Sequence, residues 1–256
     1  MKYLKFTVTP HWGLLINLHG FTKSRPVIPT VPPTTILGAL TYPLSFETRW
    51  SENLNEYSGA ERLRRTVRGV YISQDICITE YSDLSKIFSY DKREKNLISD
   101  AVAVGKLYVG PKAGRSKLDV ILMIDEDEMK LLLGKEWESI LKTSAWSICR
   151  LGARESIVSV ENVELDKAII SKKKEIHTKY YFPAEAAKVL SGDYFITNVV
   201  DWRKQPIGDY VSAPVVPLVV PYSREKKTVT ELRVRIMDES AYDVGGETLV
   251  PWPLPQ

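Results

Sequence analysis

Lysine and arginine side chains gather in four short segments of the 256-residue sequence, and such cations bind phosphate groups. The net charge at neutral pH is only +3, so a polyanionic partner would have to be bound by local clusters rather than by the whole surface. For any single cluster, an ordinary solvated face is the alternative explanation. The cations are Lys23 and Arg25; Arg62, Arg64, Arg65 and Arg68; Lys106, Lys112, Arg115 and Lys117; and Lys172, Lys173, Lys174 and Lys179.

The third segment, GKLYVGPKAGRSK from Gly105 to Lys117, is the best suited to phosphate. It contains no acidic residue, and its glycines let backbone amides and guanidinium groups approach a phosphate closely. Three tyrosines near the basic segments, Tyr108, Tyr180 and Tyr181, are candidates for stacking on the bases of single-stranded RNA. Together, the four clusters favour RNA as the partner.

The sequence lacks the motifs of the commonest enzyme and cofactor sites. Two cysteines, Cys77 and Cys149, and three histidines, His11, His19 and His177, show no spacing typical of metal ligands or of a disulfide framework. There is also no glycine-rich nucleotide-binding loop and no nucleophile elbow. We therefore expect no metal site and no cofactor.

A proline-rich stretch, SRPVIPTVPPTTILGAL from Ser24 to Leu40, follows the first basic segment. Each proline fixes φ and removes a backbone donor, which predicts a stiff, extended arm. A helix is predicted to begin at Thr34 and Thr35, whose hydroxyls can cap free amides, and Pro43 is expected to limit its regular part. Gly38 inside this helix costs about 1 kcal/mol relative to alanine, which indicates a close approach by another backbone.

The periodicity of apolar residues predicts strands and helices around the basic segments. Alternation predicts strands, and apolar residues at three- and four-residue spacing from Glu126 onward predict a helix that ends near Gly152. The order strand, helix, strand, strand, helix, strand predicts an α+β fold of the ferredoxin-like, RNA-recognition type. The predicted elements are a strand at 3–9, the helix from Thr34, strands at 68–78 and 118–125, the helix from 126 and a strand at 156–165.

The rest of the sequence predicts an insertion and a second part. Residues 78–117 are charged and rich in tyrosine, and we interpret them as an insertion between two strands. Beyond Leu165, short β segments alternate with prolines, which predicts a first domain over 1–165 and a smaller β-rich domain over 166–256. Neither a signal peptide nor a membrane-spanning stretch is evident, so we expect a cytoplasmic protein without membrane contact.

Two stretches resemble a known protein family. The opening strand, followed by HWGL and by SRPVIPTVPPTTILGAL, resembles the N-terminal signature of the Cas five family, the repeat-associated mysterious protein (RAMP) subunit of CRISPR Cascade complexes. CRLGARESIVSVENVEL resembles the glycine-containing turn between the second helix and the fourth strand of that family. The resemblance covers residues 1–50 and 145–165, and its details are most similar to archaeal type I-A members.

The resemblance implies a RAMP domain whose insertion is a thumb that bends around the 5′ handle of the CRISPR RNA. It implies a non-catalytic, RNA-binding subunit of a Cascade ribonucleoprotein for antiviral defence. The implied partners are the RNA handle, a Cascade backbone subunit and the large subunit. With the basic segments, the RNA-binding residues are expected to be Lys23, Arg25, Arg62, Arg64, Arg65, Arg68, Lys112, Arg115, Lys117, Arg150, Gly152 and Arg154.

Two other functions stay open at this stage. One branch of the family, type I-C, cuts precursor CRISPR RNA without metal, using tyrosine, lysine and histidine. The stretch KKKEIHTKYYF brings such residues together, although on a strand His177, Lys179 and Tyr181 would share one face and Tyr180 the other. These residues do not match the catalytic motif of that branch, which favours the non-catalytic subunit. A metal-independent endoribonuclease that processes precursor CRISPR RNA is the alternative. The third hypothesis is a stand-alone RNA- or protein-binding module.

Overall fold

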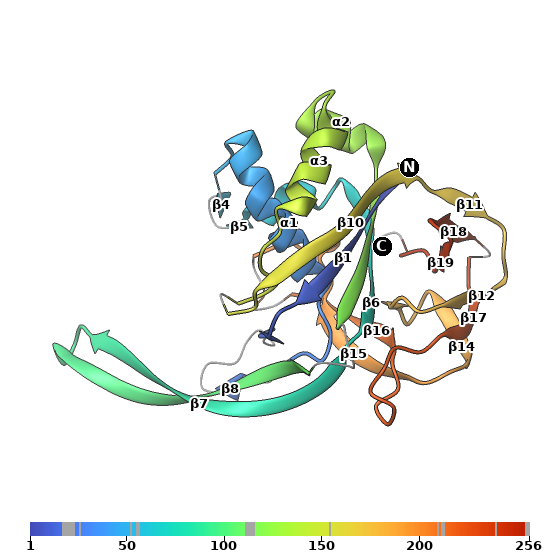
Figure 1. Cartoon of the computed structure of the whole chain (residues 1–256). Coiled ribbons are helices and arrows are strands. Elements are labelled where there is room, and N and C mark those ends of the chain that lie inside the picture. Colours follow the sequence, from blue (N-terminus) through green and yellow to red (C-terminus); the bar gives the residue numbers. More distant parts are fainter. Residues whose placement is uncertain are drawn as a thin grey trace.

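The protein has a mixed α/β fold with few helices and several small sheets (Figure 1). Within the part described, none of the helices is long and apolar enough to cross a membrane. The structure is a computed structural model that describes residues 1–16, 24–25, 27–51, 53–54, 57–110, 116–153, 155–208, 210, 213–238 and 240–253.

The central unit is a four-stranded antiparallel sheet in the order β10-β1-β9-β6. β1 (Lys2–Pro10) is an inner strand that pairs with both β9 (Lys117–Ile124) and β10 (Val158–Lys167). β6 (Val67–Asp75) forms the far edge. All four strands lie where alternation or a short apolar run predicted them. β9 has the most continuous apolar run of the four strands, and six of its eight residues are buried. Both of its faces are therefore covered.

Three helices lie on one side of this sheet (Figure 1). They are α1 (Pro33–Thr48), α2 (Glu126–Leu133) and α3 (Trp137–Trp146). The leucines of α1, including Leu37 and Leu40, are fully buried and join the main hydrophobic core. Burial of this face, rather than helix propensity alone, therefore stabilises α1.

Two predicted helix boundaries are wrong. α1 continues through Pro43 to Thr48, because Pro43 is itself buried and Leu40 and Leu44 anchor the helix in the core on either side of it. The second predicted helix is instead two helices, since Gly134 adopts a φ of 78° and ends α2. α3 ends at Trp146, before the turn that contains Gly152.

The predicted insertion forms one long antiparallel hairpin that projects from the body (Figure 1). Its strands are β7 (Cys77–Asp91) and β8 (Asn96–Gly110). Near its base, β8 also pairs with β2 (Gly13–Leu14) and, in parallel, with β3 (Ser24–Arg25). β3 belongs to the proline-rich arm, so the arm is extended there, as predicted, and is attached to the hairpin.

The C-terminal part contains three small antiparallel sheets, in agreement with the predicted β-rich character. The C-terminal strands are β11 (Ile169–Ser171), β12 (Glu175–Thr178), β13 (Phe182–Pro183), β14 (Ala187–Ser191), β15 (Tyr194–Val200), β16 (Val215–Pro221), β17 (Leu232–Ile236), β18 (Ala241–Val244) and β19 (Glu247–Leu249).

In its described residues, the chain between α1 and β6 contains three short elements. They are the strands β4 (Asn53–Leu54) and β5 (Tyr57–Ser58) and the short helix η1 (Gly59–Leu63).

The buried apolar residues form two clusters. The larger one includes the central sheet, its helices and residues beyond position 165, among them Trp202 and Val216. The smaller one lies within the C-terminal part and includes Phe182, Leu232 and Val234. The division into domains at residue 165 stays a prediction, and the main core draws on both sides of that boundary.

Candidate nucleic-acid interface

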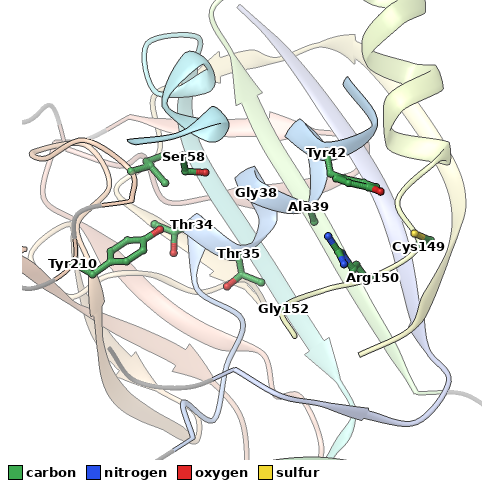
Figure 2. Close-up of a pocket in the computed structure, with 11 residues that line it drawn as sticks. Thr34, Thr35, Gly38, Ala39, Tyr42, Ser58, Cys149, Arg150, Gly152 and Tyr210 are labelled. Carbon is green, nitrogen blue, oxygen red and sulfur yellow. The ribbon is translucent and has the colours of Figure 1, made fainter. Parts of the chain in front are cut away.

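A pocket of about 280 Å³ lies beside the N-terminal half of α1 (Figure 2). One wall comes from the proline-threonine-glycine stretch and another from the turn after α3. These are the two stretches that carried the family resemblance, and the fold brings them together across more than 100 residues of sequence. The lining residues are Thr34, Thr35, Gly38, Ala39, Tyr42, Ser58, Cys149, Arg150, Gly152, Ile207 and Tyr210.

The start of α1 contributes the positive end of a helix to this pocket. Pro32 is the N-cap, and no side chain makes a capping hydrogen bond, so the predicted capping by threonine hydroxyls is wrong. The physical reason is that Thr34 and Thr35 already lie inside the first turn, where the amide of Thr35 donates to the Pro32 carbonyl at 3.0 Å. A helix N-terminus without a side-chain cap favours an anion.

Gly38 lies on the pocket-lining side of α1. A Cβ at this position would have no described atom within 4 Å. The predicted close approach therefore does not come from another described segment of the chain. The absence of a side chain instead leaves open space in the pocket.

Arg150 and Tyr42 form a stacked pair at the other end of the pocket (Figure 2). The guanidinium carbon of Arg150 lies 4.8 Å from the centre of the Tyr42 ring. Arg150 is exposed, so its planar group is supported on one side by the ring and is accessible to a ligand. A guanidinium plane held in this way can stack on a nucleobase or bind a phosphate.

The turn that carries Arg150 depends on Gly152. Its φ is +94°, and a Cβ there would lie 2.9 Å from the carbonyl oxygen of Leu15. The same Leu15 carbonyl accepts a hydrogen bond from the amide of Ala153, and the Leu15 amide donates to the Ser156 hydroxyl. Only glycine fits this close packing, which fixes the turn against the chain that follows β1.

Tyr210 closes the pocket near the start of α1. Burial raises the pKa of its hydroxyl, while a hydrogen bond with the Thr34 side chain acts in the opposite direction. Tyr210 and Tyr42 were both missed from the sequence. The helical spacing of Thr35, Gly38 and Tyr42, three and four residues apart, is the signal that could have identified Tyr42. No local pattern points to Tyr210.

The arginines of the second basic segment lie outside this pocket. Arg62 donates to the Ser51 carbonyl at 2.8 Å and stacks on Trp50. Arg68 donates from Nε and Nη2 to Asp125, at 3.1 and 2.6 Å. Arg64, Arg65 and Arg68 help to line a second pocket of about 370 Å³. Intramolecular partners, such as Glu61 at 2.5 Å from Arg64, already engage most of these guanidinium groups.

The other predicted basic residues are only partly described. Lys117 lies on β9 rather than on the hairpin and pairs with Glu161 at 3.0 Å. Arg25 lies on β3, where its backbone pairs with Val104. Outside the described residues are Lys23, Lys112, Arg115, Arg154 and the side chain of Arg25.

The stretch around His177 does not form the predicted face. β12 ends at Thr178, and Tyr180 and Tyr181 are both buried in the main core, so neither can stack on a base. After Thr178 the chain leaves the strand, and the amide of Tyr181 donates to the carbonyl of Ile72 on β6 at 3.1 Å. His177 is exposed and lies 3.6 Å from Glu231, while Lys179 pairs with Glu247 at 2.8 Å. His19 and the side chain of Tyr108 lie outside the described part.

The described residues contain no group of three or more histidine, cysteine or carboxylate side chains that could hold a metal ion. Cys77 and Cys149 are both free thiols. The groups that line the pocket described above are hydroxyls, the thiol of Cys149, a guanidinium group, two tyrosine rings and a helix N-terminus.

Comparison with known proteins gives relatives over nearly the whole chain. No protein-family model matches the sequence. The CRISPR system aCascade subunit Cas5 1 of Saccharolobus solfataricus is 28% identical over 98% of this chain and 99% of the relative. CRISPR-associated protein Cas5 3 of the same organism is 28% identical over 98% and 99% of the two chains.

A solved structure shares the fold. The crystal structure of a CRISPR protein from Archaeoglobus fulgidus aligns with a TM-score of 0.67 and 19% identity, covering 99% of this chain and all of that chain. The family prediction made from the two motifs is confirmed by the relatives. This chain is therefore similar along nearly its full length to Cas5 proteins of an archaeal CRISPR system.

Proposed function

We propose that this protein is a non-catalytic subunit of a type I Cascade complex, and that the pocket beside α1 binds part of the 5′ handle of the guide RNA. The observation that carries the proposal is the meeting of the two family-like stretches in one pocket. One relative is an aCascade subunit by name, which supports assembly into such a complex.

The pocket offers complementary groups for one nucleotide. The N-terminus of α1 and the hydroxyls of Thr34 and Thr35 suit a phosphate. The Arg150–Tyr42 stack suits a base that is turned out of a single strand, since sequence-specific RNA recognition uses unstacked bases on guanidinium planes and aromatic rings. Gly38 leaves room for the ribose between these two ends.

The architecture supports the same assignment. We infer that the central sheet, with its order β10-β1-β9-β6 and its three helices on one side, is the ferredoxin-like RAMP domain. The hairpin of β7 and β8 is the thumb. Its exposed apolar side chains, including Leu84, Phe88 and Leu97, suit contact with a neighbouring backbone subunit. We also keep the large subunit as a partner of the complex.

The composition of the pocket favours binding over cleavage. Its described lining contains no histidine, lysine or carboxylate that could act as a general base near neutral pH. Burial raises the pKa of Tyr210, so its hydroxyl is protonated at neutral pH and does not act as a general base. His177, the most suggestive histidine of the sequence, is paired with Glu231 on the C-terminal sheet.

The test is a titration of handle RNA with the purified protein and its Arg150→Ala variant. Loss of one stacked base costs about 1 to 3 kcal/mol, so the variant should bind roughly tenfold or more weakly. Arg235→Ala is the matched control, because Arg235 is an exposed arginine on the C-terminal sheet. Equal affinity for the parent and Arg150→Ala would rule out the pocket as the handle site.

A second assay separates binding from catalysis. The protein is incubated with precursor repeat RNA in the presence of a chelator, and intact RNA is the expected product. Site-specific cut products that disappear in a His177→Ala variant would contradict the proposal and favour the metal-independent endoribonuclease.

A further inference from the structure

β11 is an edge strand without a partner on its outer side within the described residues. It is the first strand of the sheet β11-β18-β19, and it pairs only with β18, where Ile170 lies opposite Tyr242. In Figure 1 it runs along the outer margin of the molecule, beyond β18 and β19. An edge of this kind presents free backbone donors and acceptors to another chain.

The strand before it shows how this protein protects an edge. β10 is also an edge strand, and it carries the charged residues Glu161, Glu164 and Asp166. Its ladder with β1 is interrupted near Asn162, which has a φ of 57°. Charges and a bulge both discourage pairing with a further strand. β11 continues the same chain after one residue and has neither feature.

β11 instead exposes two large apolar side chains. Ile169 is 65% exposed and Ile170 is 63% exposed. Adjacent residues on a strand face opposite sides, so apolar surface is uncovered on both faces of the edge. A strand added beside β11 would cover both isoleucines with its own alternating side chains while pairing the free backbone groups.

The charges around β11 indicate the kind of strand that fits. Four lysines, Lys167, Lys172, Lys173 and Lys174, lie within a few residues of the isoleucines. Lys167 and Lys172 are exposed and have no ion-pair partner within the described part of the chain. The acidic groups close by are Asp166 and Asp243, and Lys173 already holds Asp243 at 2.8 Å. The edge is therefore apolar and has at each end an exposed lysine, Lys167 or Lys172, that no described carboxylate pairs.

This charge pattern disfavours a second copy of the same chain. Two β11 edges that paired antiparallel would bring Lys167 of one copy close to Lys172 of the other, and like charges opposite each other destabilise a sheet. Carboxylates at the same positions would be attracted to the lysines. RNA has phosphates for the lysines but offers neither a backbone ladder nor apolar side chains for the isoleucines.

We propose that β11 accepts an additional β-strand from another protein subunit, an extended apolar segment flanked by acidic residues. This inference rests on the proposed function only in that the partner is sought among the other subunits of the complex. The surface is distinct from the pocket beside α1, since the two share no residue.

The test uses the complex assembled on guide RNA from the separately purified subunits. One variant, Ile169→Thr with Ile170→Thr, keeps β-branched residues but removes apolar surface. A second, Lys167→Glu with Lys172→Glu, reverses the charge. Each has a matched control elsewhere: Ile196→Thr for an exposed isoleucine on the edge strand β15, and Lys226→Glu with Lys227→Glu for exposed lysines.

One of the other protein subunits of the complex is expected to add its strand to β11. Both test variants should bind that subunit about tenfold more weakly than the parent does, because each variant loses two cross-strand interactions. Both controls should bind it normally, and all variants should bind handle RNA with parental affinity. Hydrogen exchange of the amides of Ile169 to Ser171 should slow when that subunit binds.

Four results would overturn the proposal. These are unchanged subunit binding by both test variants, unprotected β11 amides in the complex, dimerisation of the purified chain that Ile169→Thr with Ile170→Thr abolishes, and weaker RNA binding by the charge-reversed variant alone. Failure of the handle-binding proposal would look different, since it concerns the RNA affinity of Arg150→Ala and leaves subunit binding at β11 untouched.

Discussion

Gly38 and Gly152 both line the pocket beside α1, and alanine is expected to have opposite effects at the two positions. Gly38→Ala should stabilise the free protein by about 0.5 to 1 kcal/mol, because alanine favours a helix and its methyl group meets nothing within 4 Å. The same methyl group occupies space in the pocket, so handle RNA should bind several-fold more weakly. Chemical unfolding and RNA titration measure the two effects. Glu47→Ala, on the exposed end of α1, is the control for helix propensity.

Gly152→Ala should destabilise the protein by about 1 to 3 kcal/mol, because a residue with a side chain would be strained at this φ and its Cβ would press on the Leu15 carbonyl. Gly246→Ala separates the two causes. Gly246 also has a positive φ, of 80°, but a Cβ there would meet no described atom within 4 Å. Similar unfolding free energies for the two variants would mean that close packing at Gly152 contributes nothing.

At this scale the sequence named only two lining residues of the pocket, Arg150 and Gly152, as binding residues, and it did so through the resemblance. Thr34, Thr35 and Gly38 stood out because proline and glycine constrain the backbone locally, but they were predicted as a helix start and a close backbone approach rather than as binding residues. Their meeting depends on tertiary packing, which no local pattern contains. The same limit explains Tyr180 and Tyr181, which follow a basic segment in sequence yet fill the core.

At the scale of elements, Asp125 joins the start of α2 to β6. Its Oδ1 accepts from the amides of Asp127 and Glu128, both at 3.2 Å, and its Oδ2 accepts from Arg68. Asp125→Ala should lower the unfolding free energy by about 1 to 2 kcal/mol at neutral pH, since a helix cap and a charged hydrogen bond are both lost.

Acid should remove this difference. Burial alone would raise the pKa of Asp125, but the hydrogen bonds from Arg68 and the two amides outweigh it and hold the pKa below its ordinary value. The resulting stability is present above the unfolded-state pKa of about 4 and is lost as the pH falls through the folded-state pKa. The unfolding free energies of parent and variant should therefore converge as the pH falls below the unfolded-state pKa of about 4. A gap that stays constant from pH 7 to pH 2 would contradict this mechanism.

Element boundaries were less predictable than element types. The strands of the central sheet were found from alternation, which reflects a buried and a less buried side, or, for β9, from a short apolar run that is buried on both sides. The extent of α1 was missed because burial of Leu40 and Leu44 overcomes the local cost of Pro43, and the break at Gly134 was missed because the apolar spacing continues across it.

At the scale of the whole molecule, the outer hairpin should be dispensable for stability. Lys86 and Ala101 are paired, so an Asn-Gly turn can replace residues 87–100 and remove the exposed side chains of Phe88 and Leu97. None of the described residues from 87 to 100 belongs to either core cluster. The unfolding free energy should change by less than about 1 kcal/mol.

The same truncation should weaken contact with the neighbouring backbone subunit while handle RNA still binds. Size-exclusion chromatography of the assembled complex and RNA titration measure the two properties. A truncated chain that assembles normally would contradict the thumb assignment. A truncated chain that unfolds much earlier would instead mean that the hairpin supports the body through β2 and β3.

The inner position of β1 has a consequence for biosynthesis. Lys2 of β1 lies opposite Ile124 and Lys167, so neither neighbouring strand exists when β1 leaves the ribosome. At about 5 to 20 residues per second, β1 waits on the order of 10 to 30 s for β10. During that interval the apolar side chains of Leu4, Phe6 and Val8, buried in the finished protein, remain available to chaperones and to other nascent chains. Slower synthesis at low temperature lengthens this interval, so soluble yield should depend more on chaperone supply than on the stability of the finished protein.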